Sequence, residues 1–130
     1  MIAIDTNVLV RLLANDDPTQ SPRAAALFAA EEVFVAKTVL LETEWVLRFS
    51  YGLPRETIGP AFDRLTSVAS VTIEDARAVR VALDAHGAGM DFADALHVSA
   101  ARAASRFVTF DKKLVTQAGR AKVGLPIDAL

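Results

Sequence analysis

The stretch MIAIDTNVLVRLLAN (residues 1–15) places a short apolar run directly before a helical pattern. The run MIAI (1–4) is typical of a short buried strand, and the apolar residues of 6–15 recur at the spacing of one helix face. Asp5 stands between the two. The stretch therefore predicts a strand that leads through an aspartate into a helix.

The same alternation of short apolar runs and longer helical patterns continues along the chain. Strands are expected at 33–36, 70–73, 106–110 and near Val123. Helices are expected at 22–32, 38–52, 54–68 (interrupted near Gly59–Pro60), 74–87, 91–105 and 111–119. Short strands separated by helices imply crossover connections, and hence a mainly parallel sheet covered by helices on both faces. The fold class is α/β, and the length of 130 residues suits one domain over 1–130.

The composition excludes several functional classes. The chain has no cysteine, so it lacks disulfides, thiol nucleophiles and cysteine metal sites. No apolar run approaches the roughly 20 residues of a membrane-spanning helix, and no secretory signal is visible. We therefore expect a cytoplasmic protein without membrane contact. No glycine-rich phosphate loop or GxSxG nucleophile turn occurs.

Two aspartates follow expected strands and begin expected helices. Asp5 comes after 1–4 and Asp111 after 106–110. In a parallel sheet both would lie at the carboxyl edge, where ligands bind. Aspartate is also a favoured helix N-cap, and for either residue taken alone capping only is the favoured interpretation.

Glu42 lies inside the most apolar helical pattern, with Thr38, Trp45, Val46 and Phe49 as its helical neighbours. We expect this face to point into the core, where an unpaired carboxylate is costly unless it is hydrogen-bonded, protonated or bound to a cation. The alternative is a partly exposed glutamate at the edge of the helix. Glu44, by contrast, has Arg48 four residues on and predicts a surface ion pair.

Asp91 and Asp94 open the expected helix at 91–105. Capping explains Asp91 well, as the N-cap residue with Asp94 at the third helical position. Asp94 shares its stripe with Val98 and Ala101, which predicts that it points inward. His97 is expected to be a packed or surface residue of this helix rather than a general base.

Together, Asp5, Glu42, Asp94 and Asp111, with Asp91 beside them, form an acidic set. Gathered carboxylates repel one another and must be neutralised by protons or by metal. Oxygen-only ligands favour hard cations, Mg²⁺ or Mn²⁺, and such a site suits phosphodiester hydrolysis. Candidate phosphate contacts are Arg11, Lys37, Arg48, Arg102, Arg106, Lys112 and Lys113.

The chain resembles the PIN-domain ribonucleases, and specifically the VapC-type toxins of bacterial toxin–antitoxin pairs. The segments that carry the resemblance occur in the family's order: IAIDTNVLVRLL, LLETEWVL, DFADALHVSAA and FVTFDKKL. The resemblance implies a three-layer α/β/α sandwich around a central, mainly parallel sheet. It also implies that Asp5, Glu42, Asp94 and Asp111 form the catalytic quartet that binds Mg²⁺ or Mn²⁺.

Further residues and partners follow from the resemblance alone. Thr6 and Asn7 match the family's DTN, Thr109 matches a small polar position that hydrogen-bonds near the metal ligands, and Asp91 either assists the metal or only caps its helix. The resemblance implies a homodimer, a VapB-like antitoxin partner with a heterotetramer or larger assembly, and a structured RNA such as tRNA as substrate.

Two alternatives are left open by the sequence. One is a PIN-domain nuclease that acts in RNA processing and is not a toxin. The other is a binding or signalling module with an acidic Mg²⁺ pocket, like a phospho-acceptor receiver domain. The receiver reading requires paired acids after the first strand, where only Asp5 is present.

Overall fold

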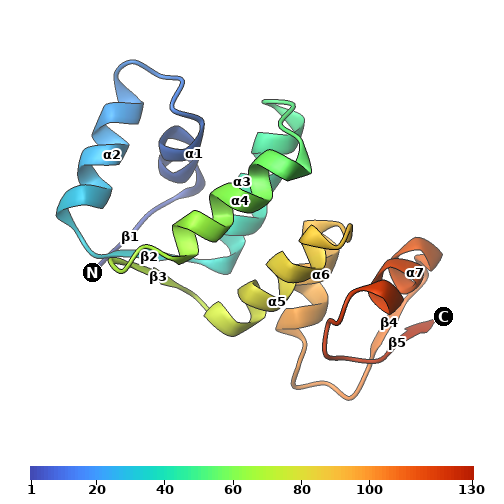
Figure 1. Cartoon of the computed structure of the whole chain (residues 1–130). Helices are drawn as coiled ribbons and strands as arrows, with labels where there is room; N and C mark the ends of the chain where they lie inside the picture. Colours follow the sequence, from blue (N-terminus) through green and yellow to red (C-terminus); the bar gives the residue numbers. More distant parts are fainter. The chain divides into compact units, whose positions relative to one another are not determined.

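The computed structural model describes residues 1–130, which form two compact units, Met1–Glu74 and Asp75–Leu130 (Figure 1). No helix of the chain is long and apolar enough to cross a membrane. Each unit combines helices with a small parallel sheet, and each is described separately.

The first unit contains three strands and four helices. In chain order they are β1 (Ile2–Ala3), α1 (Thr6–Ala14), α2 (Gln20–Ala30), β2 (Val33–Val35), α3 (Lys37–Phe49), α4 (Arg55–Thr66) and β3 (Val71–Ile73). The sheet has the order β1-β2-β3 and every pairing is parallel. Val33 pairs with Ile2 on one side and with Val71 on the other. As the central strand, β2 therefore carries two side chains, Val33 and Val35, that are fully buried.

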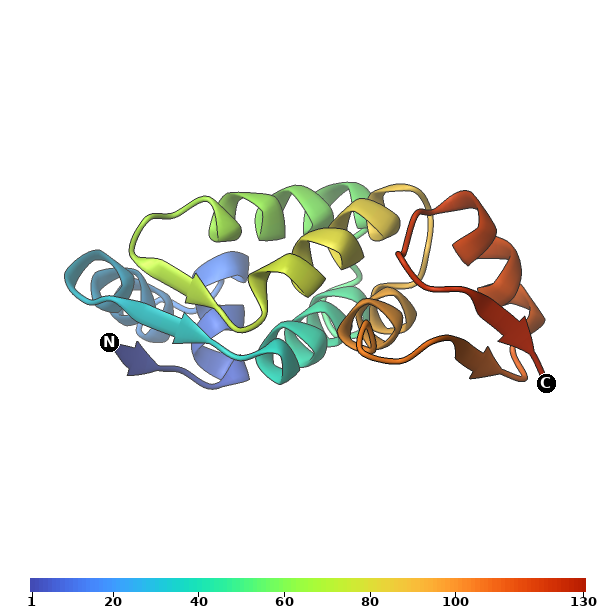
Figure 2. The same ribbon diagram turned by 90° about the horizontal axis from the view of Figure 1, so that it is seen from below.

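The second unit contains α5 (Ala76–Gly87), α6 (Phe92–Ala100), β4 (Phe107–Thr109), α7 (Lys112–Arg120) and β5 (Ile127–Ala129). Strands β4 and β5 run parallel, and Figure 2 shows them side by side beneath α7. Helices α5 and α6 pack on each other through apolar side chains such as Val79, Ala82 and Val98, all of which are fully buried. The α/β fold class with parallel strand pairing, expected from the sequence, is confirmed.

The orientation expected for α3 is wrong. Its buried residues are Leu40, Thr43, Glu44 and Leu47, which form one helical stripe. Glu42 lies on the other side and is exposed, as are Trp45 and Phe49. Glu44 does pair with Arg48, at 2.9 and 3.1 Å, but this carboxylate is only 2% exposed and so does not form a surface pair. The pairing partner allows the carboxylate to enter the core.

Helix α4 continues through Gly59–Pro60 without the expected interruption. Its buried side chains are Ile58, Phe62 and Leu65, whereas Pro60 is exposed. Proline inside a helix removes one backbone hydrogen bond and costs about 3 kcal/mol. Burial of three large apolar side chains, at about 2 kcal/mol each, offsets this cost and keeps the helix continuous.

Three other boundaries differ from expectation. β1 is a two-residue edge strand that is only partly buried, because it has a neighbour on one side only. Helix α6 ends at Ala100, since the alanine-rich segment 102–106 is exposed and has no packing to stabilise a helix. The last strand is β5 and not the segment near Val123, which is buried in the connection before the turn at Gly124.

Candidate functional site

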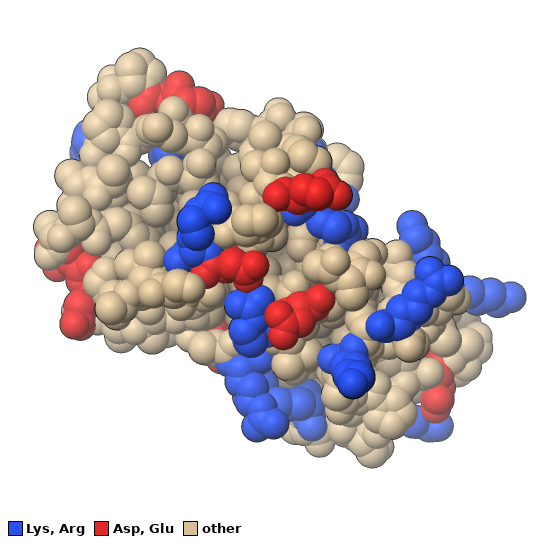
Figure 3. Space-filling view, in the orientation of Figure 1, with Lys and Arg blue, Asp and Glu red and all other residues tan.

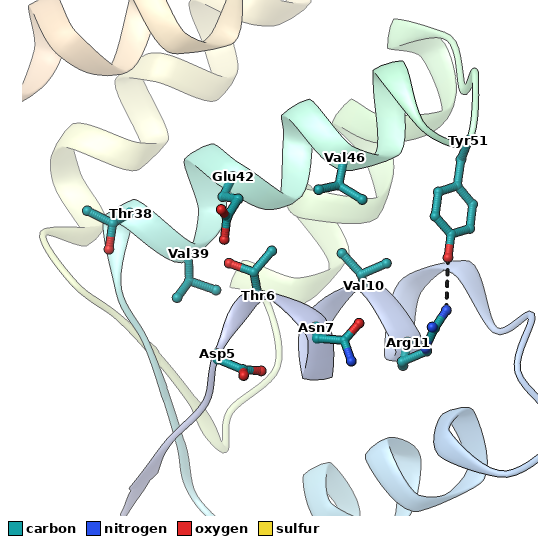
Figure 4. A pocket seen from close by; sticks show the side chains of 10 residues that line it. All are labelled: Asp5, Thr6, Asn7, Val10, Arg11, Thr38, Val39, Glu42, Val46 and Tyr51. Atoms are coloured by element: carbon teal, nitrogen blue, oxygen red, sulfur yellow. Dashed lines mark hydrogen bonds between the residues drawn. The ribbon is translucent and has the colours of Figure 1, made fainter.

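In the first unit, Asp5 and Glu42 line one open cavity of about 800 Å³ between α1 and α3. Asp5 stands at the start of α1 and Glu42 comes from the second turn of α3 (Figure 4). Thr6 and Asn7, expected near the metal ligands, line the same cavity. In Figure 4 the Glu42 carboxylate points toward Thr6. The structure therefore brings two of the four predicted acids and both of their predicted polar neighbours together.

Asp5 is the N-cap of α1, so the capping expected for this residue is confirmed. Its Oδ1 accepts a hydrogen bond from the backbone N–H of Val8 at 3.1 Å. Its other oxygen, Oδ2, accepts none, and the residue is exposed. Capping therefore occupies one oxygen of the carboxylate and leaves the second available to a ligand in the cavity.

Two further residues that line the cavity are the basic Arg11 and Tyr51, which carries a hydroxyl group. Arg11 donates a hydrogen bond from Nη1 to the Tyr51 hydroxyl at 3.0 Å (Figure 4). It donates a second one from Nε to Gln20 at 2.8 Å. Burial, followed by a hydrogen bond to Asp16, raises the pKa of Tyr51. Tyr51 was not recognised from the sequence, because no spacing rule links it to a residue 40 positions earlier.

In the second unit, Asp94 is half-buried in the third position of α6. Burial raises the pKa of its carboxyl most, and the charges of Asp91 and Asp111 raise it further, while nearby His97 lowers it. Asp91, Asp94 and Asp111 are therefore electrostatically close although they come from two helices. Val98 on the same stripe is fully buried, in agreement with the inward direction expected for Asp94.

Asp91 and Asp111 are both helix N-caps. Asp91 accepts a hydrogen bond from the Asp94 N–H at 3.0 Å, and Asp111 Oδ1 accepts from Lys113 and Leu114 at 2.9 and 3.2 Å. Thr109 supports Asp111, because its Oγ1 accepts a hydrogen bond from the Asp111 N–H at 3.0 Å. As with Asp5, the Oδ2 atom of Asp111 accepts no hydrogen bond.

The predicted acids thus fall into two groups, Asp5 with Glu42 in the first unit and Asp91, Asp94 and Asp111 in the second. Within neither unit do three His, Cys, Asp or Glu side chains converge in a geometry that holds a metal ion. The donor chemistry nevertheless suits a hard cation. The donors are carboxylate oxygens, and two of the caps retain a free oxygen. The pKa of Asp94 is raised first by burial and then by the negative charges of Asp91 and Asp111.

The candidate phosphate-binding cations differ in whether they form ion pairs. Four of them form ion pairs: Arg11 with Asp16, Arg48 with Glu44, Arg102 with Asp75 and Arg106 with Asp128. Lys112 and Lys113, at the start of α7, are exposed and form no ion pair.

The model of the PIN domain family matches residues 2–120, which include most of both units. The chain therefore belongs to the PIN domain family. No match was found among curated proteins or among solved structures. PIN domains are generally nucleases, that is, hydrolases, and those nucleases typically use divalent metals. The family and the enzyme class expected from the sequence are confirmed at this level.

Proposed function

We propose that this protein is a metal-dependent endoribonuclease that hydrolyses phosphodiester bonds in structured RNA, with Mg²⁺ or Mn²⁺ as its cofactor. One observation carries the proposal. Asp94 is half-buried and its carboxyl feels the negative charge of both Asp91 and Asp111. Three carboxylates that lie this close repel one another when all are ionised, and a bound cation would relieve that repulsion.

In the second unit, Asp94 and Asp111 are the residues that would hold the metal. Asp5 and Glu42 of the first unit are included among the metal ligands because of the resemblance to the PIN-domain ribonucleases. When bound, a divalent cation polarises the phosphate, activates water and stabilises negative charge on the leaving oxygen. The protein's own contribution is orientation. Capping hydrogen bonds fix Asp5 and Asp111, and the hydroxyl of Thr109 fixes the backbone that carries Asp111.

Cleavage of total RNA in the presence of Mn²⁺, with the cut sites mapped, tests the proposal. Asp5→Asn and Asp94→Asn are expected to lower the cleavage rate at least a hundredfold. Asparagine caps helices about as well as aspartate, so Asp5→Asn should fold normally. Glu31→Gln is the matched control, since Glu31 is an exposed acid outside the cavity. Unchanged cleavage by both active-site variants would overturn the assignment of the acids.

We further propose that the nuclease is the toxin of a VapBC-type pair, with a VapB-like antitoxin as its partner. The sequence segments that resemble VapC-type toxins support this role. A small antitoxin gene directly upstream, together with growth arrest that its product relieves, would be the expected finding. Growth unaffected by expression of an active nuclease would favour the RNA-processing alternative.

A homodimer is the assembly that we propose. Its support is an exposed aromatic pair on α3, where Trp45 is 53% and Phe49 60% exposed with ring centroids 5.1 Å apart. Large apolar side chains that cluster on a surface mark interaction sites more often than isolated ones do. A second copy of the chain would cover this pair.

A further inference from the structure

We propose that Phe110 and the exposed cations of α7 and the segment after it bind an RNA strand that has an unpaired base. This surface, the Phe110–α7 surface, consists of Phe110, Lys112, Lys113, Arg120 and Lys122. The proposal rests on the proposed ribonuclease function and extends it. It specifies where the substrate backbone lies and which structural feature of the RNA is recognised.

Ion pairing narrows the choice of cations, and position in the chain beside Phe110 and along α7 selects these four. Residues 75–130 contain eight Lys and Arg side chains and six aspartates. Arg80, Arg102 and Arg106 are each held by an aspartate, at 3.0, 2.6 and 3.0 Å. Five cations form no ion pair and are exposed: Arg77, in the first turn of α5, and the four cations of the Phe110–α7 surface. They are therefore free to contact phosphates, which an ion-paired arginine does only after losing its partner.

Helix α7 places two of these cations, Lys113 and Arg120, on one side. α7 buries Leu114 and Ala118 against its own unit. Lys113 and Arg120 are seven residues apart, which puts them nearly in line on the opposite side, about 10 Å from each other along the axis. Figure 3 shows Lys and Arg side chains projecting from the region of α7. Such a row can contact successive phosphates of one strand.

Phe110 adds a feature that a purely electrostatic surface lacks. The residue is 79% exposed, the most exposed large apolar side chain of the chain. It lies between Thr109 and Asp111, so it adjoins both the acids and the first two lysines of α7. An exposed ring among cations is typical of surfaces that stack unpaired bases, because every base offers a π-face. The combination favours RNA, in which every nucleotide carries both a phosphate and a planar base.

Fluorescence anisotropy with a labelled RNA hairpin tests the surface. The chain of residues 1–130 is used in the Asp5→Asn background, and a gel verifies that the RNA stays intact. Lys113→Gln/Arg120→Gln is compared with Arg23→Gln/Arg64→Gln, which removes the same charge from exposed residues of the first unit that form no ion pair. Phe110→Ala is measured on the hairpin and on a fully paired duplex. Circular dichroism verifies that each variant folds.

The charge variant is expected to reduce the slope of log affinity against log salt by about 0.7 for each lost phosphate contact, while the control keeps the original slope. Phe110→Ala is expected to weaken hairpin binding roughly ten- to a hundredfold without changing the slope or the binding of the duplex. A slope equal to that of the control, or equal losses on hairpin and duplex, would overturn the proposal. Loss of binding to a poly-glutamate peptide with RNA binding unchanged would also overturn it, and would identify an acidic protein partner.

The two proposals fail in distinguishable ways. If the wild-type chain cleaves no RNA but the variants lose hairpin binding as described, the ribonuclease proposal fails and the binding surface stands. If the wild-type chain cleaves RNA and the variants bind like the control, the surface is wrong and the nuclease stands.

Discussion

The backbone N–H of Asp94 donates a hydrogen bond to Asp91, and the charge of that same Asp91 adds to the effect of burial in raising the pKa of the Asp94 carboxyl. One aspartate therefore stabilises the start of α6 while it destabilises the charged form of its neighbour. Because the hydrogen bond and the charge of Asp91 have opposite effects, substitutions of Asp91 can separate its structural role from its electrostatic role.

Asp94→Asn is expected to raise the stability of the protein at neutral pH. Because the folded-state pKa of Asp94 lies above its ordinary value of 3.8, the wild type loses stability as the pH rises from below 3.8 through the raised pKa. The variant lacks this titration. Thermal unfolding should give it the higher Tm at pH 7 and an equal Tm near pH 3. A lower Tm at pH 7 would contradict the assigned environment.

Mn²⁺ affinity is expected to increase with pH across the acidic range. A proton on Asp94 competes with the cation, and the raised pKa extends this competition above pH 3.8. Calorimetric titration at several pH values measures the effect, and Glu31→Gln serves as the control with an unchanged profile. An affinity that does not vary with pH would count against Asp94 as a ligand.

Asp91→Ser is expected to preserve the cap and remove the charge. Serine is a good N-cap, so the free energy of unfolding should fall by less than about 0.5 kcal/mol, whereas Asp91→Ala should lower it by about 1 kcal/mol. The pKa of Asp94 should decrease in both variants, because the negative charge beside it is gone. Carboxyl titration by NMR measures this. An unchanged pKa would mean that the charge of Asp91 does not contribute to it.

The ion pair in α3 predicts an asymmetric effect of substitution. Glu44 is buried and Arg48 is partly exposed. Arg48→Met leaves a buried carboxylate without its partner and should destabilise the protein by about 3 kcal/mol or more, whereas Glu44→Met leaves a cation that can reach water and should cost less. Urea unfolding measures both. Equal losses would indicate that Glu44 is not in the core.

Trp45→Ser tests the proposed dimer interface on α3. Removing the exposed indole is expected to shift the protein from dimer to monomer at micromolar concentration, as measured by analytical ultracentrifugation. Val68→Ser, at another exposed apolar residue, is the control and should remain dimeric. A wild-type monomer, or a dimer that both substitutions leave intact, would contradict the assignment of the aromatic pair.

The features that could be predicted from the sequence are those that local interactions determine. The order of strands and helices, the parallel pairing and the three aspartate caps follow from apolar periodicity and from the chemistry of helix ends. The face of α3 did not follow, because Leu40 and Leu47 form one apolar stripe while Trp45 and Phe49 form another. Periodicity cannot choose between two apolar faces.

Features that depend on long-range contacts could not be predicted from the sequence, for a similar reason. β5 is defined by its pairing with β4, from Phe107 with Ile127 to Thr109 with Ala129, and nothing local distinguishes it from the apolar residues near Val123. The cavity shared by Asp5 and Glu42 is likewise a tertiary feature. That these two acids act together with Asp94 and Asp111 stays a prediction.

The caps at Asp5 and Asp111 have a consequence for ligand affinity. Each carboxylate is held in one rotamer by a backbone hydrogen bond through Oδ1, with Oδ2 left bare. A cation that bound Oδ2 would meet a pre-organised oxygen and would spare the entropy that is lost when a mobile side chain is immobilised. The hydrogen bond that starts the helix would therefore also lower the free-energy cost of binding such a cation.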